Sequence, residues 1–414
     1  MTVTDVGRAP LRLYLASRAL ALTGGSVAEA VVPLVVVLTL GGGTTAVGAV
    51  TAVTLTFSLA TRIPISAWVD AQPHQIRLQA YSQITAAATA ALIPLLWWSG
   101  LLSITTLLVA VVLVVLAKTL VSACGHSTVN QLVPADDRVR AIGTLNSLSS
   151  AADIVGQTGG PALLKLLPAP LILLADTVMN TVSAILVRRL DRYETPAPTQ
   201  PAAPDTEPDT AARQSLISMA RNVVAAGPVQ LLWLSGIVGS VIAPVTLVYL
   251  IRTLGIDAAL VGVLYAFGAL GGISGGLLAH RALTRLHMWL LITVSSMLSA
   301  SAAGCLLAAS HLPHLVYPLV IVFELLSAFA GTLLVAAVYG TLQTRTEHTQ
   351  IARVMSIAST GMEGLALLGI GIGTLIAARL SAHAAITTAS LGYLALSLVA
   401  LTAAIRDHTS PDAR

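Results

Sequence analysis

Charged residues are scarce in this sequence. Asp, Glu, Lys and Arg make up 10% of 414 residues, whereas soluble domains carry about 25%. This scarcity excludes an ordinary soluble globular domain. Apolar runs recur along the chain at about the 20 residues that a membrane-spanning helix needs, and they lack the period-two alternation of β-barrel strands. The sequence therefore predicts an all-α polytopic membrane protein.

Cysteines and catalytic motifs are also sparse. The two cysteines, Cys124 and Cys305, lie far apart in apolar runs, which indicates core packing and neither a disulfide nor a metal site. The chain has no GxxxxGK[ST] loop for ATP and no His, Asp or Cys cluster of the kind an enzyme needs. We expect no enzyme activity, no cofactor and no metal. The net charge of +4 fits short basic loops and requires no nucleic-acid partner.

The apolar runs predict twelve spanning helices in two sets of six. The first set is expected at 13–40, 45–69, 79–99, 101–126, 141–167 and 170–188. The second set is expected at 228–251, 258–280, 288–310, 314–340, 352–377 and 382–404. The predicted domains are an N-terminal six-helix bundle (1–190), a linker with an interfacial helix near 212–226 (191–227), and a C-terminal six-helix bundle with a short tail (228–414). The region 188–213 is rich in Pro, Ala and acids, which is typical of a disordered linker.

The distribution of basic residues predicts the orientation. Most of the 22 Lys and Arg fall on one side if both termini and the linker are cytoplasmic, and cytoplasmic loops carry an excess of these residues. Only Lys165, Arg252 and Arg379 would then face outward. We expect a multi-pass protein of the bacterial cytoplasmic membrane, acting as a monomer.

The two halves of the sequence repeat. A basic residue and two glycines four apart recur at one constant offset, as Arg140, Gly156 and Gly160 and as Arg353, Gly369 and Gly373. Such glycine pairs let a neighbouring helix approach closely, and Pro161 is expected to bend its helix. Two pseudo-symmetric six-helix halves in parallel orientation are the frame of many secondary transporters.

Two stretches carry a resemblance to the major facilitator superfamily. NQLVPADDRVRAIGTLNSLSSAADIVGQTGGP resembles the loop and fifth helix of its bacterial multidrug exporters. Its Gly156-x-x-x-Gly160-Pro161 is similar to the tail of the antiporter signature, although Ser147 replaces a glycine. ISAWVDAQPHQIR resembles the loop between helices two and three, with Ser66 at a family glycine and Ala71 at a basic residue. The resemblance spans residues 10–405 and implies a major facilitator fold and a drug or natural-product exporter.

The same resemblance implies a cytoplasmic gate. Asp70, Arg77 and Arg140 are candidates for a latch that holds the outward-open state. In the second half, His280 and Arg281 occupy the equivalent place, with histidine where the family has an acid.

Five acids fall inside predicted spans: Glu29, Asp153, Asp176, Glu324 and Glu363. A charge at mid-membrane costs about 2.5–3.5 kcal/mol on insertion scales, so such residues are functional candidates. Asp153 and Glu363 lie on polar helix faces, where coupling and purely structural hydrogen bonding both remain open. The resemblance favours Glu29 for proton coupling, and Glu324 has few polar neighbours. Asp176 is expected near the outer end, in reach of water.

Lys118 is the basic residue expected deepest in a span. It could neutralise Asp153 or Glu29 in one state, or it could extend to the lipid headgroups.

The leading hypothesis is a secondary transporter that exports a small amphipathic molecule in exchange for protons, by alternating access. Its partners would be the lipid bilayer, a small-molecule substrate and protons. The alternatives are proton-coupled uptake of a nutrient, and a lipid flippase or non-transport protein on the same fold.

Overall fold

The computed structural model describes residues 8–132, 138–191, 218, 221, 223–346 and 351–409. The elements within these ranges are helices, and none is a strand. Eleven helical stretches there are long and apolar enough to cross a membrane. The predicted all-α, multi-pass membrane fold is therefore confirmed.

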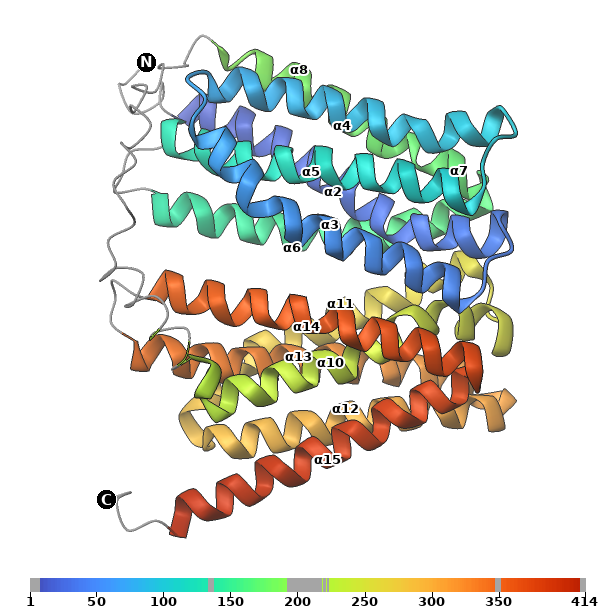
Figure 1. The fold of residues 1–414 in the computed structure, drawn as a ribbon, viewed down its shortest axis with the longest axis vertical. Coiled ribbons are helices and arrows are strands. Elements are labelled where there is room, and N and C mark those ends of the chain that lie inside the picture. Colours follow the sequence, from blue (N-terminus) through green and yellow to red (C-terminus); the bar gives the residue numbers. More distant parts are fainter. Residues whose placement is uncertain are drawn as a thin grey trace. The chain divides into compact units, whose positions relative to one another are not determined.

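The N-terminal unit contains the helices that precede the linker (Figure 1). They are α2 (Arg8–Leu34), α3 (Thr44–Asp70), α4 (Gln75–Trp98), α5 (Ile104–Leu132), α6 (Arg138–Ala162), α7 (Ala169–Ile172) and α8 (Leu174–Arg188). α2 packs against α6 and α8, α4 packs against α5 and α8, and α3 packs against α5.

The C-terminal unit repeats this pattern. Its helices are α10 (Gly227–Val248), α11 (Ala258–Arg285), α12 (Met288–His311), α13 (Val316–Arg345), α14 (Ile351–Arg379) and α15 (Ala382–Thr409). α10 packs against α14 and α15, and α12 packs against α13 and α15. Each of these four contacts has its equivalent among the helices of the N-terminal unit, so the two halves share one internal arrangement.

The repeated glycines lie where helices approach most closely. A Cβ atom on Gly156 would lie 2.7 Å from the backbone nitrogen of Val27 in α2. A Cβ on Gly369 would clash with the carbonyl oxygen of Ile237 in α10, and one on Gly373 with that of Val241. In both units, therefore, the fifth helix meets the first along a surface that leaves no room for a side chain.

Several helix bounds differ from the sequence prediction. The first span does not continue as an α-helix to residue 40, because α2 passes into a π-helical turn at Val35–Thr39. The fifth span ends earlier than 167: α6 stops at Ala162, next to Pro161, and a 3₁₀ turn follows at Leu163–Lys165. Since α6 ends one residue after Pro161, this proline lies at the end of the helix and not at a mid-helix bend. The sixth span is interrupted at Leu173, between α7 and α8.

α6 is the one predicted span outside the eleven apolar stretches. At 25 residues it is long enough, but it is the most polar of the long helices. Of the predicted interfacial helix at 212–226, residues 218, 221 and 223–225 are helical. The domain boundaries predicted at 190 and 228 flank a region that is largely outside the described ranges, and they stay predictions.

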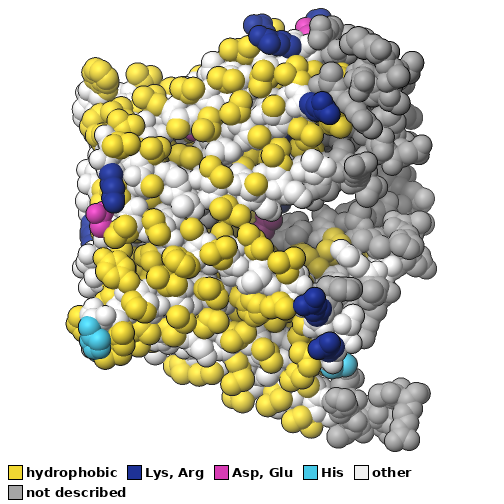
Figure 2. Space-filling model, turned by 180° about the vertical axis from the view of Figure 1, so that it is seen from behind, with side chains coloured by type: hydrophobic (Ala, Val, Ile, Leu, Met, Phe, Trp, Pro, Cys, Tyr) yellow, Lys and Arg dark blue, Asp and Glu magenta, His cyan; other side chains and the backbone are white. Residues whose placement is uncertain are grey.

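The outer surface of the helices is apolar. Large hydrophobic side chains are exposed along most helices, including Ile63, Leu95, Leu277 and Leu398. Figure 2 shows hydrophobic side chains over most of the described surface in view, with Lys and Arg near the helix ends. Such an exposed apolar surface is suited to lipid and unsuited to water.

Candidate functional site

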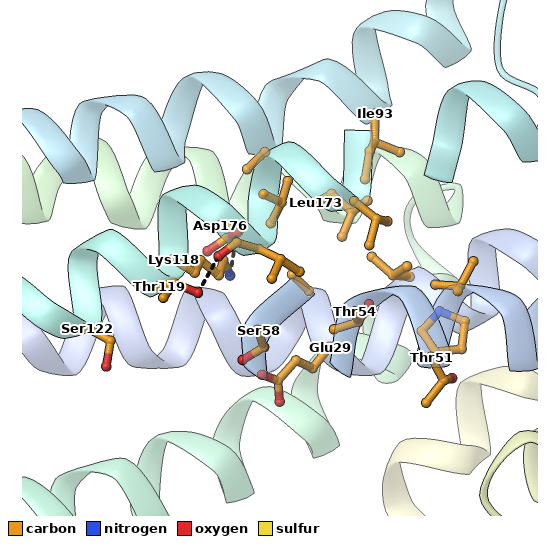
Figure 3. Close-up of a pocket in the computed structure, with 18 of the residues that line it drawn as sticks. Glu29, Thr51, Thr54, Ser58, Ile93, Lys118, Thr119, Ser122, Leu173 and Asp176 are labelled. Carbon is orange, nitrogen blue, oxygen red and sulfur yellow. Dashed lines mark hydrogen bonds and ion pairs between the residues drawn. The ribbon is translucent and has the colours of Figure 1, made fainter. Parts of the chain in front are cut away.

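The N-terminal unit contains an open cavity of about 780 Å³. Its walls come from α2, α3, α4, α5 and α8, and Figure 3 shows the side chains that point into it. Apolar residues such as Val32, Val50 and Ile93 form part of the lining. The polar part consists of hydroxyl and ionisable side chains: Thr51, Thr54, Ser58, Ser66, Thr119, Ser122, Glu29, Arg62, Lys118 and Asp176.

An ion pair forms one wall of this cavity. Lys118 Nζ of α5 lies 2.9 Å from Asp176 Oδ2 of α8 (Figure 3). The Asp176 side chain is fully buried, whereas 28% of the Lys118 side chain is exposed. Asn180, one turn further along α8, donates from Nδ2 to Asp176 Oδ1 at 2.7 Å. The carboxylate is therefore held by one charged partner and one amide.

Asp176 was expected near the outer end of its span, within reach of water. Its side chain is fully buried in the structure, so the expected contact with water is wrong. Asp176 lies in the first turn of α8, just after the helix break at Leu173, and belongs to the buried face of that helix. Lys118 was expected to neutralise Asp153 or Glu29 or to reach the headgroups. In this structure its partner is Asp176. The sequence did indicate a polar neighbour for Asp176, because Asn180 lies four residues later on the same helix face.

Two glycines of α2 make room for the ion pair. A Cβ on Gly24 would lie 2.7 Å from Asp176 Oδ1, and a Cβ on Gly25 would lie 3.2 Å from Lys118 Nζ. Contacts below 3.0 Å require something to move, so a side chain at Gly24 would displace the carboxylate. The Gly24-Gly25 pair thus lets α2 pass directly beside both charges.

Glu29 lies one turn beyond these glycines and is exposed to the cavity that it lines. Asp153 is not part of the cavity lining. Its Oδ1 accepts a 2.6 Å hydrogen bond from Ser26 of α2, at the level where Gly156 packs on the same helix. The N-terminal unit therefore brings together Glu29, Lys118 and Asp176 at one cavity and holds Asp153 close by.

The other two acids lie in the C-terminal unit. Glu324 of α13 faces α11, where a Cβ on Gly268 would lie 3.2 Å from Glu324 Oε2. Glu363 lies half-buried on α14. This unit contains a cavity of about 340 Å³, lined by uncharged residues including Ser235, Thr246 and Tyr393. Neither Glu324 nor Glu363 is among its lining residues.

The gate candidates remain untested. Arg77 Nε donates to Asp191 Oδ1 at 2.9 Å, a partner that the sequence did not indicate. Asp70 is exposed at the end of α3, and Arg281 is exposed on α11. The side chains of Arg140 and His280 lie outside the described part of the structure. No group of three or more His, Cys, Asp or Glu among the described residues could hold a metal ion.

Solved structures of transporters resemble this chain over almost its full length. A bacterial homologue of the human lysosomal transporter Spinster matches with a TM-score of 0.66 and 15% identity, covering 99% of this chain and 98% of that one. A bacterial homologue of the iron transporter ferroportin gives 0.71 and 16%, covering 99% and 100%. The POT family transporter PepTSo gives 0.72 and 9%, covering 97% and 98%. At these identities the similarity shows the fold alone.

No curated protein sequence matches this one. The family model for the Major Facilitator Superfamily matches residues 14–338. Together with the solved structures, this match indicates a transporter and not an enzyme. The chain therefore belongs to the Major Facilitator Superfamily.

Proposed function

We propose that this protein is a secondary active exporter that moves a small amphipathic molecule out of the cell in exchange for protons, by alternating access. The observation that carries the proposal is the cavity of the N-terminal unit, which is lined both by the exposed Glu29 and by the Lys118–Asp176 ion pair. Ionisable groups at membrane depth are costly and are kept where they line a pathway or relay charge.

The cavity lining supports an amphipathic substrate. Its volume of about 780 Å³ lies within the roughly 300–1,000 Å³ of pockets that take drug-sized ligands. Val32, Val50 and Ile93 offer apolar contacts, and Thr51 and Ser58 offer hydrogen bonds. A molecule with an apolar body and a polar end can satisfy both kinds of wall.

Glu29 is the proposed proton carrier. Asp176 already has Lys118 as a neutralising partner, and Asp153 has Ser26 as a hydrogen-bond donor. Glu29 shares the cavity with the substrate and is exposed to it. Proton and substrate can thus compete for one site, which is what exchange requires. Glu324 and Glu363 are candidates for a second coupling group.

The remaining predictions belong to the same proposal. The protein would lie in the bacterial cytoplasmic membrane, as a monomer, with both termini and the linker in the cytoplasm. Asp70, Arg77, Arg140, His280 and Arg281 would form contacts that open and close the cytoplasmic side. The halves would move as bodies around the substrate, as in other transporters built from repeats.

The test is transport into proteoliposomes that contain the full chain. The vesicle interior is made acidic, and a panel of fluorescent amphipathic compounds, including ethidium and a neutral dye, is supplied outside. Antiport predicts accumulation of at least one compound, and loss of that accumulation when nigericin collapses the pH gradient. Glu29→Gln should abolish accumulation. Asp257→Asn, which neutralises an exposed acid outside the cavity, should leave accumulation unchanged.

The direction of the gradient separates the alternatives. Accumulation only with an acidic exterior would favour nutrient uptake by symport and would contradict export. Equal transport with an acidic interior and with an acidic exterior would show that protons do not drive it. Exchange of a labelled phospholipid between leaflets, without movement of soluble compounds, would favour the flippase.

A further inference from the structure

The N-terminal unit contains a second group of buried polar side chains, separate from the cavity. The group lies between α2, α4, α5 and α8, toward the end of the unit where α2 begins. None of its members lines the cavity. Its buried members are Tyr14, Ser17, Gln79, Gln83, Thr128, Asn180 and Ser183, and the partly buried Arg18, whose Nε atom is buried, lies next to Ser17 in the sequence.

Helix register connects this group to the ion pair. Gly24 of α2 lies against Asp176 of α8, and Ser17 Oγ lies 3.0 Å from Ser183 Oγ. Ser17 lies seven residues before Gly24 on α2, and its partner Ser183 lies seven residues after Asp176 on α8. The two helices are therefore antiparallel and in register. Seven residues of helix span about 10 Å. Asn180 lies within this distance on the same buried face of α8, so each turn of that face carries a polar side chain.

Gln83 lies at the level of Ser183. Ala80 of α4 packs in one core cluster with Val187 of α8. Gln83 is about one turn further along α4, and Ser183 is one turn back along α8. Since α4 and α8 also run antiparallel, these two steps lead to the same depth. On the other side of Ala80, Gln79 Oε1 accepts a hydrogen bond from the Thr128 hydroxyl of α5.

The side chain of Gln83 is the decisive feature. It is 0% exposed, and neither its Nε2 nor its Oε1 has a hydrogen-bond partner among the described residues. The same holds for Nε of Arg18, one residue after Ser17 on α2. Buried polar groups are nearly always hydrogen-bonded, to protein or to ordered water. A site that offers donors and an acceptor together suits water, which both accepts and donates, better than it suits a bare ion.

We propose that Gln83 and Arg18 bind ordered water inside the N-terminal unit, and that this water continues along Ser183 and Asn180 to Asp176. Asp176 then has a source of solvation on the side away from the cavity. When Lys118 moves away from Asp176, the carboxylate is not left without partners. This site goes beyond the proposed export function and does not depend on proton coupling.

The site is tested by solid-state NMR of the full chain in lipid bilayers, with ¹⁵N-labelled side-chain amides of Gln and Asn. The experiment measures how fast magnetisation passes from water to each amide. The Gln83 signal is assigned by its disappearance in Gln83→Met, and the exposed Gln230 is the wet reference. We expect transfer to Gln83 as fast as to Gln230. An absence of transfer to Gln83 would mean a dry site and would overturn the proposal.

The connection to Asp176 has its own measurement. Met has the size of Gln but forms no comparable hydrogen bonds, so Gln83→Met should cause loss of water transfer to the Asn180 amide. Transfer to Asn180 that persists in this variant would show that its water comes from the cavity, and the continuous path would be refuted. Gln230→Met is the matched control. Gln83→Leu replaces Gln83→Met if the latter does not fold. Since no substrate or gradient is used, a failure of the export proposal does not affect the result.

Discussion

Replacing Lys118 with methionine tests the ion pair most directly. The change keeps an unbranched side chain, one atom shorter, and removes its charge, while Asp176 stays fully buried. Breaking a buried pair by removing one partner costs about 3–5 kcal/mol, because the other charge is left uncompensated. Asp176 keeps the amide of Asn180 as a donor at 2.7 Å. We therefore expect a loss of about 3 kcal/mol in the free energy of unfolding, at the lower end of that range.

Neutralising the other partner of the ion pair should reduce the free energy of unfolding by less. In Asp176→Asn, the amide oxygen still accepts from Asn180, and Lys118 can extend into the cavity, because 28% of its side chain is already exposed. Losing one such contact costs about 1–2 kcal/mol. The structure thus predicts an asymmetry: Lys118→Met is more destabilising than Asp176→Asn. The double variant should recover part of the loss, because it leaves no buried charge.

The assay is equilibrium unfolding in mixed micelles, in which SDS is titrated and tryptophan fluorescence is followed. The control is Lys165→Met, which makes the same chemical change at an exposed residue and should lie within about 0.5 kcal/mol of the parent. Equal stability of Lys118→Met and Lys165→Met would refute the argument. A larger loss of stability for Asp176→Asn than for Lys118→Met would also refute it. The unpaired charge would then cost more on Lys118, which has access to water, than on the buried Asp176.

Three further predictions concern packing, hydrogen bonding and topology. Gly369→Ala should destabilise the protein by about 1–3 kcal/mol through overpacking against α10. Gly371→Ala on the same helix has open space around it and should not destabilise the protein. Similar melting curves for the two variants would contradict the close approach of α14 to α10. Ser26→Ala should cost about 1.5–3 kcal/mol, because it removes a hydrogen bond to the charged Asp153, and unchanged SDS unfolding would count against that contact. Tags placed within 188–213 should react with impermeant reagents only in inverted vesicles, and reaction in intact cells would reverse the predicted orientation.

The general architecture could be predicted from the sequence because lipid imposes a strict rule on length and polarity. Apolar runs of about 20 residues have few alternatives to a spanning helix. The glycine pairs of α6 and α14 lie at tight helix contacts because only glycine permits that approach. The repeat was visible in the sequence through those same residues.

The partner of Lys118 could not be predicted in the same way. Ion pairing depends on which helices are neighbours and on how each is rotated, and a single sequence contains neither. The burial of Asp176 could not be predicted either, because counting residues from the ends of a span does not show which helix faces are covered by neighbouring helices. The role proposed for Gln83 could not be predicted either, because it depends on burial and on hydrogen-bond partners, which only the three-dimensional structure reveals.

The π-helical turns are a further feature that the two halves share. One lies at Val35–Thr39 and the other at Tyr249–Thr253, and each is followed by a glycine with positive φ, Gly41 or Gly255. A π turn holds an extra residue and is rare, so two independent acquisitions at matching places require two coincidences. The matched turns therefore extend the repeat beyond the glycine pairs. Their sequences, VVVLT and YLIRT, differ at four of five positions, although both turns are π-helical.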